Sequence, residues 1–309
     1  MNIQSRGDMY KVDNAIIMAA GVSSRFAPLS YEKPKALTVV RGEVLIERQI
    51  KQLRAAGIPE IYIVTGYKAE QFNYLQEKFN VRLIFNSEYM TRNNHSSIYA
   101  AKDVIRNSYI CSADNYFLYN PFEPQVEESY YAALYASGDT NEWCMQTDAD
   151  DYITRVEVGG HDSWYMLGHA FWSENFSAHF TSFLEEVYDL PQTNNLFWED
   201  IFIDHLDTLK MKIRKYPGDY IFEFDSIDEL RIFDKRYIED TGSQILKDIA
   251  RRLNGTEAEI THIRATKTTN TTVTGIQFVF RSEQYTYTYG EGIIKKPCNK
   301  SVVGKEIEW

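Results

Sequence analysis

The chain contains few cysteines and no long apolar run. Its three cysteines, Cys111, Cys144 and Cys298, lie far apart among 309 residues, which supports neither a disulfide framework nor a Cys-X-X-Cys metal site. No apolar segment approaches the roughly 18 residues that a membrane-spanning helix needs. Residues 1–11 also lack the pattern of a signal peptide. The sequence therefore predicts a folded cytosolic protein with no membrane partner.

Basic residues are scarce relative to acidic ones. The net charge of −11 argues against nucleic acid as the main partner, because a polyphosphate backbone calls for a basic surface. The imbalance lies in residues 1–235, which hold 22 Lys and Arg against 35 Asp and Glu, whereas residues 236–309 hold 11 against 9. This change predicts a boundary near residue 240, with domains over 1–239 and 240–309. Whether the chains form a homo-oligomer stays open.

The first part of the chain alternates short apolar runs with helical patterns. Continuous apolar runs are typical of strands buried on both faces, and apolar residues spaced three or four apart indicate helices. The alternation predicts an α/β fold, with a Rossmann-like, mixed and mostly parallel sheet flanked by helices. Such sheets bind ligands beyond the carboxyl ends of their strands. The predicted strands cover residues 14–20, 60–65, 81–85 and 108–113, and the predicted helices cover 44–56 and 68–79.

From Tyr130 the pattern becomes partly antiparallel. Residues of about 130–220 are expected to form an extension that carries acceptor specificity, and Ser226 with Glu229 three residues later gives a capping-box pattern at a helix start. The tail after residue 240 predicts a small α+β module. The predicted strands are 131–136, 152–158, 163–172, 211–216, 220–225, 260–264, 273–280 and 283–289, and the predicted helices are 174–189, 198–209 and 242–253.

A run of small residues follows the first predicted strand. Small side chains let backbone N–H groups approach phosphates closely, and nearby cations neutralise the charge that develops during phosphoryl transfer. We therefore expect this run to bind a nucleotide and the two cations that follow it to be catalytic. The run comprises Ala19, Ala20, Gly21, Val22, Ser23 and Ser24, and the cations are Arg25 and Lys35.

Three acidic residues are candidates for a metal site. Asp114 ends an apolar strand, where Mg²⁺ could bind it together with phosphate oxygens. Glu223 and Asp225 are two residues apart, so a strand would place both on one face. A lone Asp at a strand end is more often a turn former, and the second segment is what favours metal binding here.

Two tryptophans stand beside carboxylates in separate segments. Glu142 precedes Trp143, and Glu199 follows Trp198. Aromatic faces with nearby negative charge can hold a quaternary ammonium, which has no N–H group to donate. In a chain with 14% aromatic residues, tryptophans also pack in the core, so both interpretations stay open.

The motifs together resemble a known enzyme family. Residues 18–37 resemble the signature Ala-Ala-Gly-X-Gly-X-Arg…Pro-Lys of sugar-nucleotide-type nucleotidyltransferases, with Ser23 in place of the second glycine. Over residues 14–235 the order of motifs resembles the bacterial CTP:phosphocholine cytidylyltransferases. These motifs include Gly66-Tyr67, Arg92–Ser97, Ala113–Asn115, Thr140–Trp143, Trp198–Asp200 and Phe222–Ser226.

The resemblance implies roles for individual residues. Asp114 and Asp225, with Glu223 as helper, would coordinate Mg²⁺. Asn94, Ser97 and Ala113 would lie near the nucleotide. Glu142, Trp143 and Trp198 would lie near choline. The implied reaction joins the cytidylate of CTP to phosphocholine and releases pyrophosphate by direct attack on the α-phosphorus.

Several alternatives remain at this stage. The acceptor could be a sugar 1-phosphate or another phosphorylated amine, and a non-catalytic nucleotide-sensing protein could share the fold. The tail weakly resembles the opening strands of choline-kinase-like phosphotransferases, but we expect no kinase activity because the sequence ends before a catalytic Asp segment. A vestigial lobe, a truncated segment and a dimerisation module stay open for it.

Overall fold

The computed structural model describes residues 9–267 and 273–295, and these form two compact units. The first unit comprises residues up to Gly21 together with Ala36–Glu223, and the second comprises Val22–Lys35 together with the chain from Phe224 onward. The division lies elsewhere than composition suggested, because residue 240 falls inside the second unit between two of its helices. A segment near the start of the chain thus packs with the C-terminal part.

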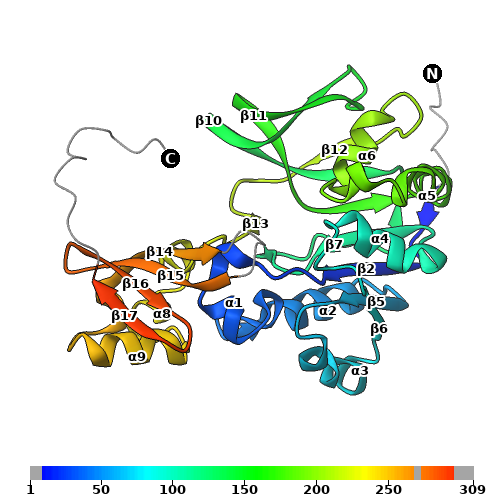
Figure 1. The fold of residues 1–309 in the computed structure, drawn as a ribbon. Helices are drawn as coiled ribbons and strands as arrows, with labels where there is room; N and C mark the ends of the chain where they lie inside the picture. Colours follow the sequence, from blue (N-terminus) through cyan, green and yellow to red (C-terminus); the bar gives the residue numbers. More distant parts are fainter. Residues whose placement is uncertain (1–8, 268–272, 296–309) are drawn as a thin grey trace, which may run out of the picture. The chain divides into compact units, whose positions relative to one another are not determined.

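A seven-stranded mixed sheet organises the first unit (Figure 1). Its order is β12-β10-β11-β7-β2-β5-β6. The four strands β7, β2, β5 and β6 are parallel, β11 is antiparallel to both of its neighbours, and β12 is parallel to β10. The predicted fold class is confirmed. The strands are β2 (Asn14–Ala19), β5 (Glu60–Thr65), β6 (Arg82–Phe85), β7 (Ser108–Ser112), β10 (Tyr130–Thr147), β11 (Ile153–Trp172) and β12 (Lys212–Lys215).

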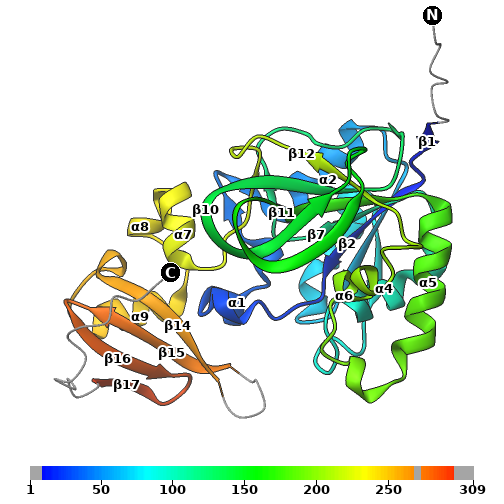
Figure 2. The same ribbon diagram turned by 90° about the horizontal axis from the view of Figure 1, so that it is seen from above.

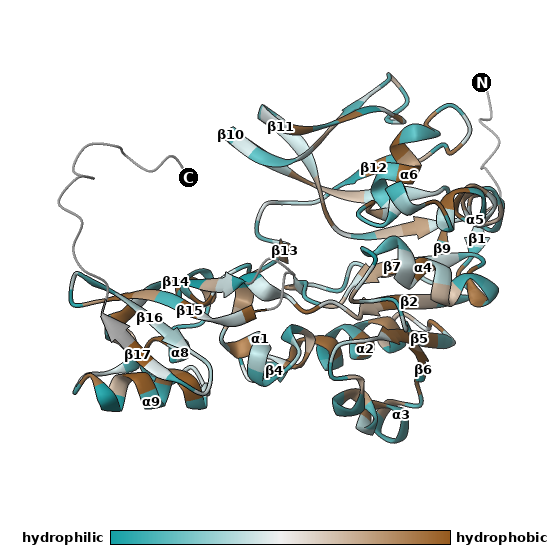
Figure 3. Cartoon of the chain, in the orientation of Figure 1, coloured by the Kyte–Doolittle hydropathy of each residue, from teal (hydrophilic) through white to brown (hydrophobic). Residues whose placement is uncertain are grey.

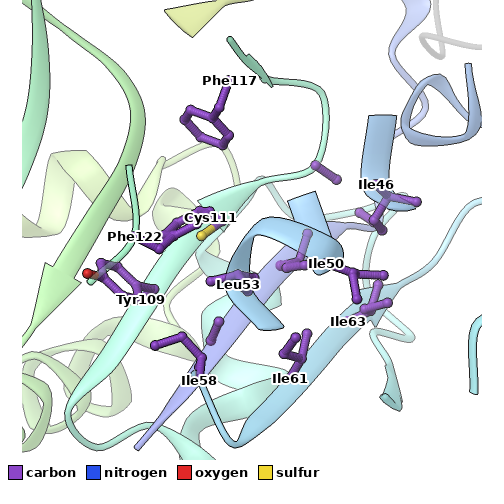
Figure 4. Packing of buried hydrophobic residues seen from close by; sticks show 14 of the residues in the cluster. Ile46, Ile50, Leu53, Ile58, Ile61, Ile63, Tyr109, Cys111, Phe117 and Phe122 are labelled. Atoms are coloured by element: carbon purple, nitrogen blue, oxygen red, sulfur yellow. The ribbon is translucent and has the colours of Figure 1, made fainter. Parts of the chain in front are cut away.

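Helices cover both faces of this sheet, which explains why the middle positions of its central strands are apolar. Successive strand residues point to opposite faces, so Ile17 of β2 joins one core while Ile16 joins the other. Figure 4 shows the first core, where Ile46, Ile50 and Leu53 of α2 pack over the strands. Helices α2 (Leu45–Ala55) and α3 (Tyr74–Phe79) line this face, and α4 (His95–Ala101), α5 (Glu174–Tyr188) and α6 (Trp198–Asp204) line the other.

The long hairpin of β10 and β11 differs from the sequence prediction. The stretches 152–158 and 163–172 were expected as separate strands, and Gly159 and Gly160 lie between them. The structure continues through both as one twisted strand (Figure 2), with irregular register against β10 and positive φ at Gly138 and Gly159. Gly138 and Gly159 therefore lie at β-bulges rather than in a turn.

Other local differences are smaller. The helix expected over 68–79 is a 3-10 turn, η3 (Ala69–Phe72), followed by α3, and the strand expected over 220–225 ends at Phe222. Short strands complete the first unit: β1 (Tyr10–Lys11), β3 (Val39–Val40), β4 (Glu43–Val44), β8 (Tyr116–Phe117), β9 (Gln125–Val126) and β13 (Ile221–Phe222). No helix in the described ranges is long and apolar enough to cross a membrane.

The second unit packs a helix against a four-stranded antiparallel sheet of order β14-β15-β16-β17. Leu246, Ile249 and Ala250 form the buried face of α9, which carries both hydrophobic and hydrophilic residues (Figure 3). The predicted helix and strands of the tail are confirmed, and β17 was not expected. The elements are η1 (Ser24–Phe26), α1 (Leu29–Glu32), α7 (Ile227–Phe233), α8 (Arg236–Glu239), α9 (Gln244–Arg252), β14 (Ile260–Lys267), β15 (Val273–Phe280), β16 (Glu283–Thr288) and β17 (Gly292–Lys295).

Candidate active site

The carboxyl ends of β2 and β7 lie side by side at one edge of the sheet. Met18 pairs with Ser112, and the Ala113 N–H donates to the Met18 carbonyl at 3.2 Å. Asp114 therefore follows its strand beside the place where Ala20 leaves β2. This is the edge at which parallel sheets bind ligands.

Gly66 is required where the chain leaves β5. The N–H of Tyr67 donates to the carbonyl of Ala20 at 3.0 Å, which ties the two strand ends together. A Cβ added at Gly66 would lie 2.9 Å from that carbonyl oxygen and 2.6 Å from the ring of Tyr89. Only glycine allows so close an approach of the two backbones.

Ser23 adopts a left-handed backbone conformation in the signature segment. Its φ is 50° and its ψ is 51°, and its side chain makes no capping hydrogen bond to the following turn η1. Glycine adopts this region without a Cβ penalty, which gives a physical reason for the glycine of the related signature at this position. Serine is tolerated here at a cost in backbone strain.

The two predicted catalytic cations converge on Asp225 within the second unit. The Arg25 guanidinium forms an ion pair with Asp225 Oδ2 and is largely exposed, whereas Lys35 is buried and its Nζ lies 3.7 Å from Oδ1. The N–H of Asp225 donates to Glu229 Oε2 at 2.7 Å, and Ser226 caps the same helix, α7. The start of α7 thus fixes a carboxylate that gathers both cations.

A second pair of predicted residues meets in the first unit. Strand β13 pairs antiparallel with β8, and this pairing brings the segment of Glu223 beside that of Asp114 and Asn115. The buried Asn115 Nδ2 lies 3.5 Å from Glu223 Oε2, and its Oδ1 is enclosed without a hydrogen-bond partner. An enclosed amide oxygen beside carboxylates is a donor set that suits a hard cation.

Glu199 is a half-buried carboxylate at the start of α6. It accepts hydrogen bonds from the Tyr131 hydroxyl at 3.0 Å and from Asn94 Nδ2 at 3.1 Å. Enclosure of the carboxylate by protein raises the pKa of Glu199 to about 7, while the two hydrogen bonds oppose this shift. In the described part of the chain, no Lys or Arg forms an ion pair with it.

Two tyrosines link this carboxylate to others in the first unit. Burial raises the pKa of Tyr131, and the charges of Glu199 and Glu223 raise it further. Burial and the charges of Glu142 and Glu223 likewise raise the pKa of Tyr165. Glu142, Glu199 and Glu223 therefore act electrostatically on one pair of phenols and form, with them, an acidic aromatic region.

Comparison with known proteins places the chain in a family. The MobA-like NTP transferase domain family matches residues 15–147. Choline-phosphate cytidylyltransferase of Streptococcus pneumoniae is 36% identical over 217 residues, which cover 70% of this chain and 95% of that protein. The chain belongs to this cytidylyltransferase family. It is a nucleotidyltransferase by fold and by sequence.

Two further members of the family are informative. The 2-aminoethylphosphonate cytidylyltransferase of Lancefieldella rimae is 37% identical over 237 residues, covering 75% of this chain and 96% of that protein. The solved structure of the CTP:phosphocholine cytidylyltransferase from Streptococcus pneumoniae superposes with a TM-score of 0.70 and 35% identity, covering 74% of this chain and 99% of that one. The family thus includes members named for different acceptors.

The predicted site residues fall into two groups, one in each compact unit. Within the described residues, no cluster of three or more His, Cys, Asp or Glu side chains is placed to hold a metal, and Asp225 belongs to a different unit from its two predicted partners. The first unit holds Ala19, Ala20, Gly21, Asn94, Ser97, Ala113, Asp114, Glu142, Trp143, Trp198 and Glu223, and the second holds Val22, Ser23, Ser24, Arg25, Lys35 and Asp225.

The two predicted acceptor tryptophans occupy different environments. Trp198 is 1% exposed and stacks on Tyr131 with ring centroids 5.5 Å apart, while Trp172 meets it edge-on at 5.0 Å. It is a residue of the core. Trp143 is half-buried and meets the exposed Phe197 edge-on at 5.7 Å, so it keeps a partly open ring.

The segment of Asn94 and Ser97 was expected as a polar loop and forms the start of α4. Ser97 is buried and accepts a hydrogen bond from Asn86 at 3.3 Å. Asn94 holds α6 in place, because its Oδ1 accepts from the Trp198 N–H at 2.7 Å. A role for either residue at the nucleotide stays a prediction.

Sequence reasoning missed four residues of the site, namely Glu199, Tyr131, Tyr165 and Asn115. Two signals were present in the sequence. Glu199 stands beside Trp198 in a motif that was noted, and Asn115 follows Asp114 directly. The two tyrosines lie within strands of a tyrosine-rich chain, where nothing local distinguishes them.

Proposed function

We propose that this nucleotidyltransferase transfers cytidylate from CTP to phosphocholine and releases pyrophosphate. The observation that supports this acceptor is Glu199, a carboxylate that accepts hydrogen bonds from a phenol and an amide and forms no ion pair with a Lys or Arg of the described residues. A carboxylate in such surroundings favours a cation, and a cationic ligand group can supply it. Phosphocholine carries a trimethylammonium group at one end and the attacking phosphate at the other.

In the proposed reaction, a phosphate oxygen of phosphocholine attacks the α-phosphorus of CTP in line with the departing pyrophosphate. Arg25 and Lys35 neutralise negative charge on the reacting phosphates, and no covalent enzyme intermediate is needed. Asp225 keeps these two cations at fixed positions relative to each other. Buried Lys35 has few other conformations and acts as a fixed point charge, whereas exposed Arg25 can move to meet the leaving group.

Magnesium is the cofactor that the donor chemistry favours. The enclosed oxygen of Asn115 and the carboxylates of Asp114 and Glu223 are hard oxygen donors of the kind Mg²⁺ takes together with phosphate oxygens and water. When bound, Mg²⁺ would polarise the phosphates and favour departure of pyrophosphate. We propose Asp114 and Glu223 as its ligands.

A second acceptor, 2-aminoethylphosphonate, is favoured by a specific observation. The ring of Trp198 is packed in the core, so the aromatic walls available for a trimethylammonium group come from Trp143 and the tyrosines. A primary ammonium instead needs hydrogen-bond acceptors, which Glu199 and Glu142 could provide. The relative from Lancefieldella rimae carries that acceptor in its name.

Pyrophosphate release decides among these candidates. CTP, UTP and dTTP are each combined with phosphocholine, 2-aminoethylphosphonate, phosphoethanolamine and glucose 1-phosphate in the presence of Mg²⁺. We expect the highest kcat/KM with CTP and phosphocholine. A higher value with 2-aminoethylphosphonate would transfer the assignment to that acceptor, and release with glucose 1-phosphate alone would rule out the cation site.

A further inference from the structure

The signature segment Val22–Lys35 belongs to the same compact unit as the C-terminal module, residues 240–295. About a quarter of this chain has no counterpart in the phosphocholine enzyme of known structure, since 74% of the chain accounts for 99% of that protein. The segment that carries Arg25 and Lys35 therefore packs within a unit larger than the family requires.

Apolar contacts join the segment to the module. Ala27 is 1% exposed and lies in the core formed by Ile249, Ile260 and Phe278, and Leu29 packs against that core. The ring of Tyr31 stacks on Tyr289 with centroids 3.9 Å apart and an interplanar angle of 27°. Apolar side chains in and just before α1 therefore contact the module.

A polar contact supports the same junction. The N–H of Ile245 donates to Glu32 Oε1 at 3.0 Å. Ile245 lies in the first turn of α9, where backbone N–H groups have no partner within the helix and attract negative charge. Glu32 thus joins the end of α1 to the start of α9.

The segment also contains a conformation that local sequence disfavours. Ser23 has a left-handed backbone conformation, which is unfavourable for a residue with a Cβ. Contacts elsewhere must offset this cost, and the junction with the module provides them. Related signatures with glycine at this position avoid the cost.

We propose that the C-terminal module positions the signature segment, with Tyr289 and the N-terminal turn of α9 as the positioning elements. They hold Tyr31 and Glu32, and through them the chain that carries Arg25 and Lys35 to Asp225. This inference rests on the proposed function only for its effect on turnover. Its effect on the segment itself is independent of any substrate.

Tyr289→Ala in the full chain tests the proposal. We expect kcat for pyrophosphate release to fall about tenfold, the scale set by loss of an aromatic pair, with KM for either substrate changed less than about twofold. Amide hydrogen exchange of residues 26–33 should become faster. Tyr289→Phe keeps the ring and should restore both values.

Arg281→Ala is the matched control. It removes the exposed ion pair between Arg281 and Glu259, two residues of the module outside α1 and α9. We expect wild-type exchange in residues 26–33 and wild-type kcat. The inference would be overturned if Arg281→Ala and Tyr289→Ala changed kcat and hydrogen exchange equally. It would also be overturned if Tyr289→Ala kept the wild-type exchange and kcat. If wild-type protein released no pyrophosphate, the proposed function would fail while the exchange measurement still tested positioning.

Discussion

Two carboxylates of this protein are stabilised in opposite ways. Asp225 receives Arg25 and Lys35 from the signature segment, so protein cations balance its charge. Glu199 receives a phenol and an amide, and enclosure by protein raises its pKa to about 7. One carboxylate is already paired, whereas the other keeps its affinity for a cation.

The surroundings of the two carboxylates suit ligand groups of opposite charge. The region of Asp225 gathers positive charge, as phosphoryl transfer requires, and the region of Glu199 gathers negative charge and aromatic rings, as an ammonium group requires. A change at Asp225 should therefore affect turnover, and a change at Glu199 should affect acceptor binding.

Asp225→Asn should have the largest effect. The amide no longer pairs with the two cations, so we expect kcat to fall by about 10³-fold, the scale of losing a charged group at a phosphoryl-transfer site. Thermal unfolding checks that the variant is folded. Asp240→Asn removes an exposed partner of Lys247 in the same unit and should leave kcat unchanged. Turnover near wild type in Asp225→Asn would assign the carboxylate a purely structural role.

Glu199→Gln should raise the KM for phosphocholine by about tenfold to a hundredfold, because a hydrogen-bonded or charge-paired group of this kind contributes about 1.5–3 kcal/mol. The KM for CTP should change little, since the residue is proposed to contact the acceptor alone. The exposed Glu185 on α5, which pairs with Lys102, offers a control in Glu185→Gln. A parallel rise in both KM values would show that Glu199 supports the fold of the site rather than the acceptor.

Trp198 and Trp143 should respond differently to substitution, because Trp198 is buried in the core and Trp143 is half-buried. Trp198→Ala should lower the free energy of unfolding by about 3–5 kcal/mol, because it empties a core position enclosed by Tyr131 and Trp172. Trp143→Ala should destabilise less and raise the KM for phosphocholine more than that for CTP. Denaturant titration and steady-state kinetics measure both. If Trp143→Ala lowers stability alone, this ring also belongs to the core.

The sequence predicted strands most successfully where the deciding pattern lies within a short stretch of residues. The strands at 14–20, 60–65 and 108–113 were found because parallel strands covered on both faces are apolar at every position. The prediction left residues 159–160 outside both strands, whereas β11 continues through them, because a glycine can serve either a turn or a bulged strand. Local sequence cannot distinguish these two uses.

The candidate site was only partly predictable because its contacts are distant in sequence. Arg25 was identified as a cation of the signature, but its partner Asp225 lies 200 residues away. Burial raises the pKa of Glu199, and the two side chains that hydrogen-bond to it, Tyr131 and Asn94, are 68 and 105 residues away. The association of Val22–Lys35 with the C-terminal module depends on single buried contacts, such as that of Ala27, that form no sequence pattern.

The titration of Glu199 should appear in both binding and stability. Its folded-state pKa of about 7 lies above the ordinary value of 4.5, so between these values the folded protein holds a proton that the unfolded chain releases. Stability should therefore fall as pH rises from about 4.5 to 7, relative to Glu199→Gln. The KM for phosphocholine should fall over the same rise through pH 7, because the cation needs the ionised form.

Comparison with Glu199→Gln isolates this effect. Titration of the substrate phosphate affects wild type and variant alike, so only the difference between their pH profiles reports Glu199. Burial raises the pKa of Glu199 and Asp200 raises it further, whereas Asn94 and Tyr131 lower it, and none of these neighbours carries a positive charge. Parallel profiles would mean that the carboxylate is ionised throughout and that the pKa of the folded protein is not raised.

Ser23→Gly should have the smallest effect and concerns only the Asp225 region. Glycine removes a left-handed strain of about 1–2 kcal/mol, and its greater freedom in the unfolded chain costs about 0.5–1 kcal/mol, so we expect a net gain in stability of up to about 1 kcal/mol. Turnover should stay within about twofold, because the serine side chain makes no capping hydrogen bond to η1 and the backbone that carries Arg25 is unchanged. Chemical denaturation with and without CTP measures the gain. A loss of stability would mean that the serine side chain stabilises the protein by more than its backbone strain costs. A gain in stability together with lower turnover would mean that catalysis needs a rigid signature segment.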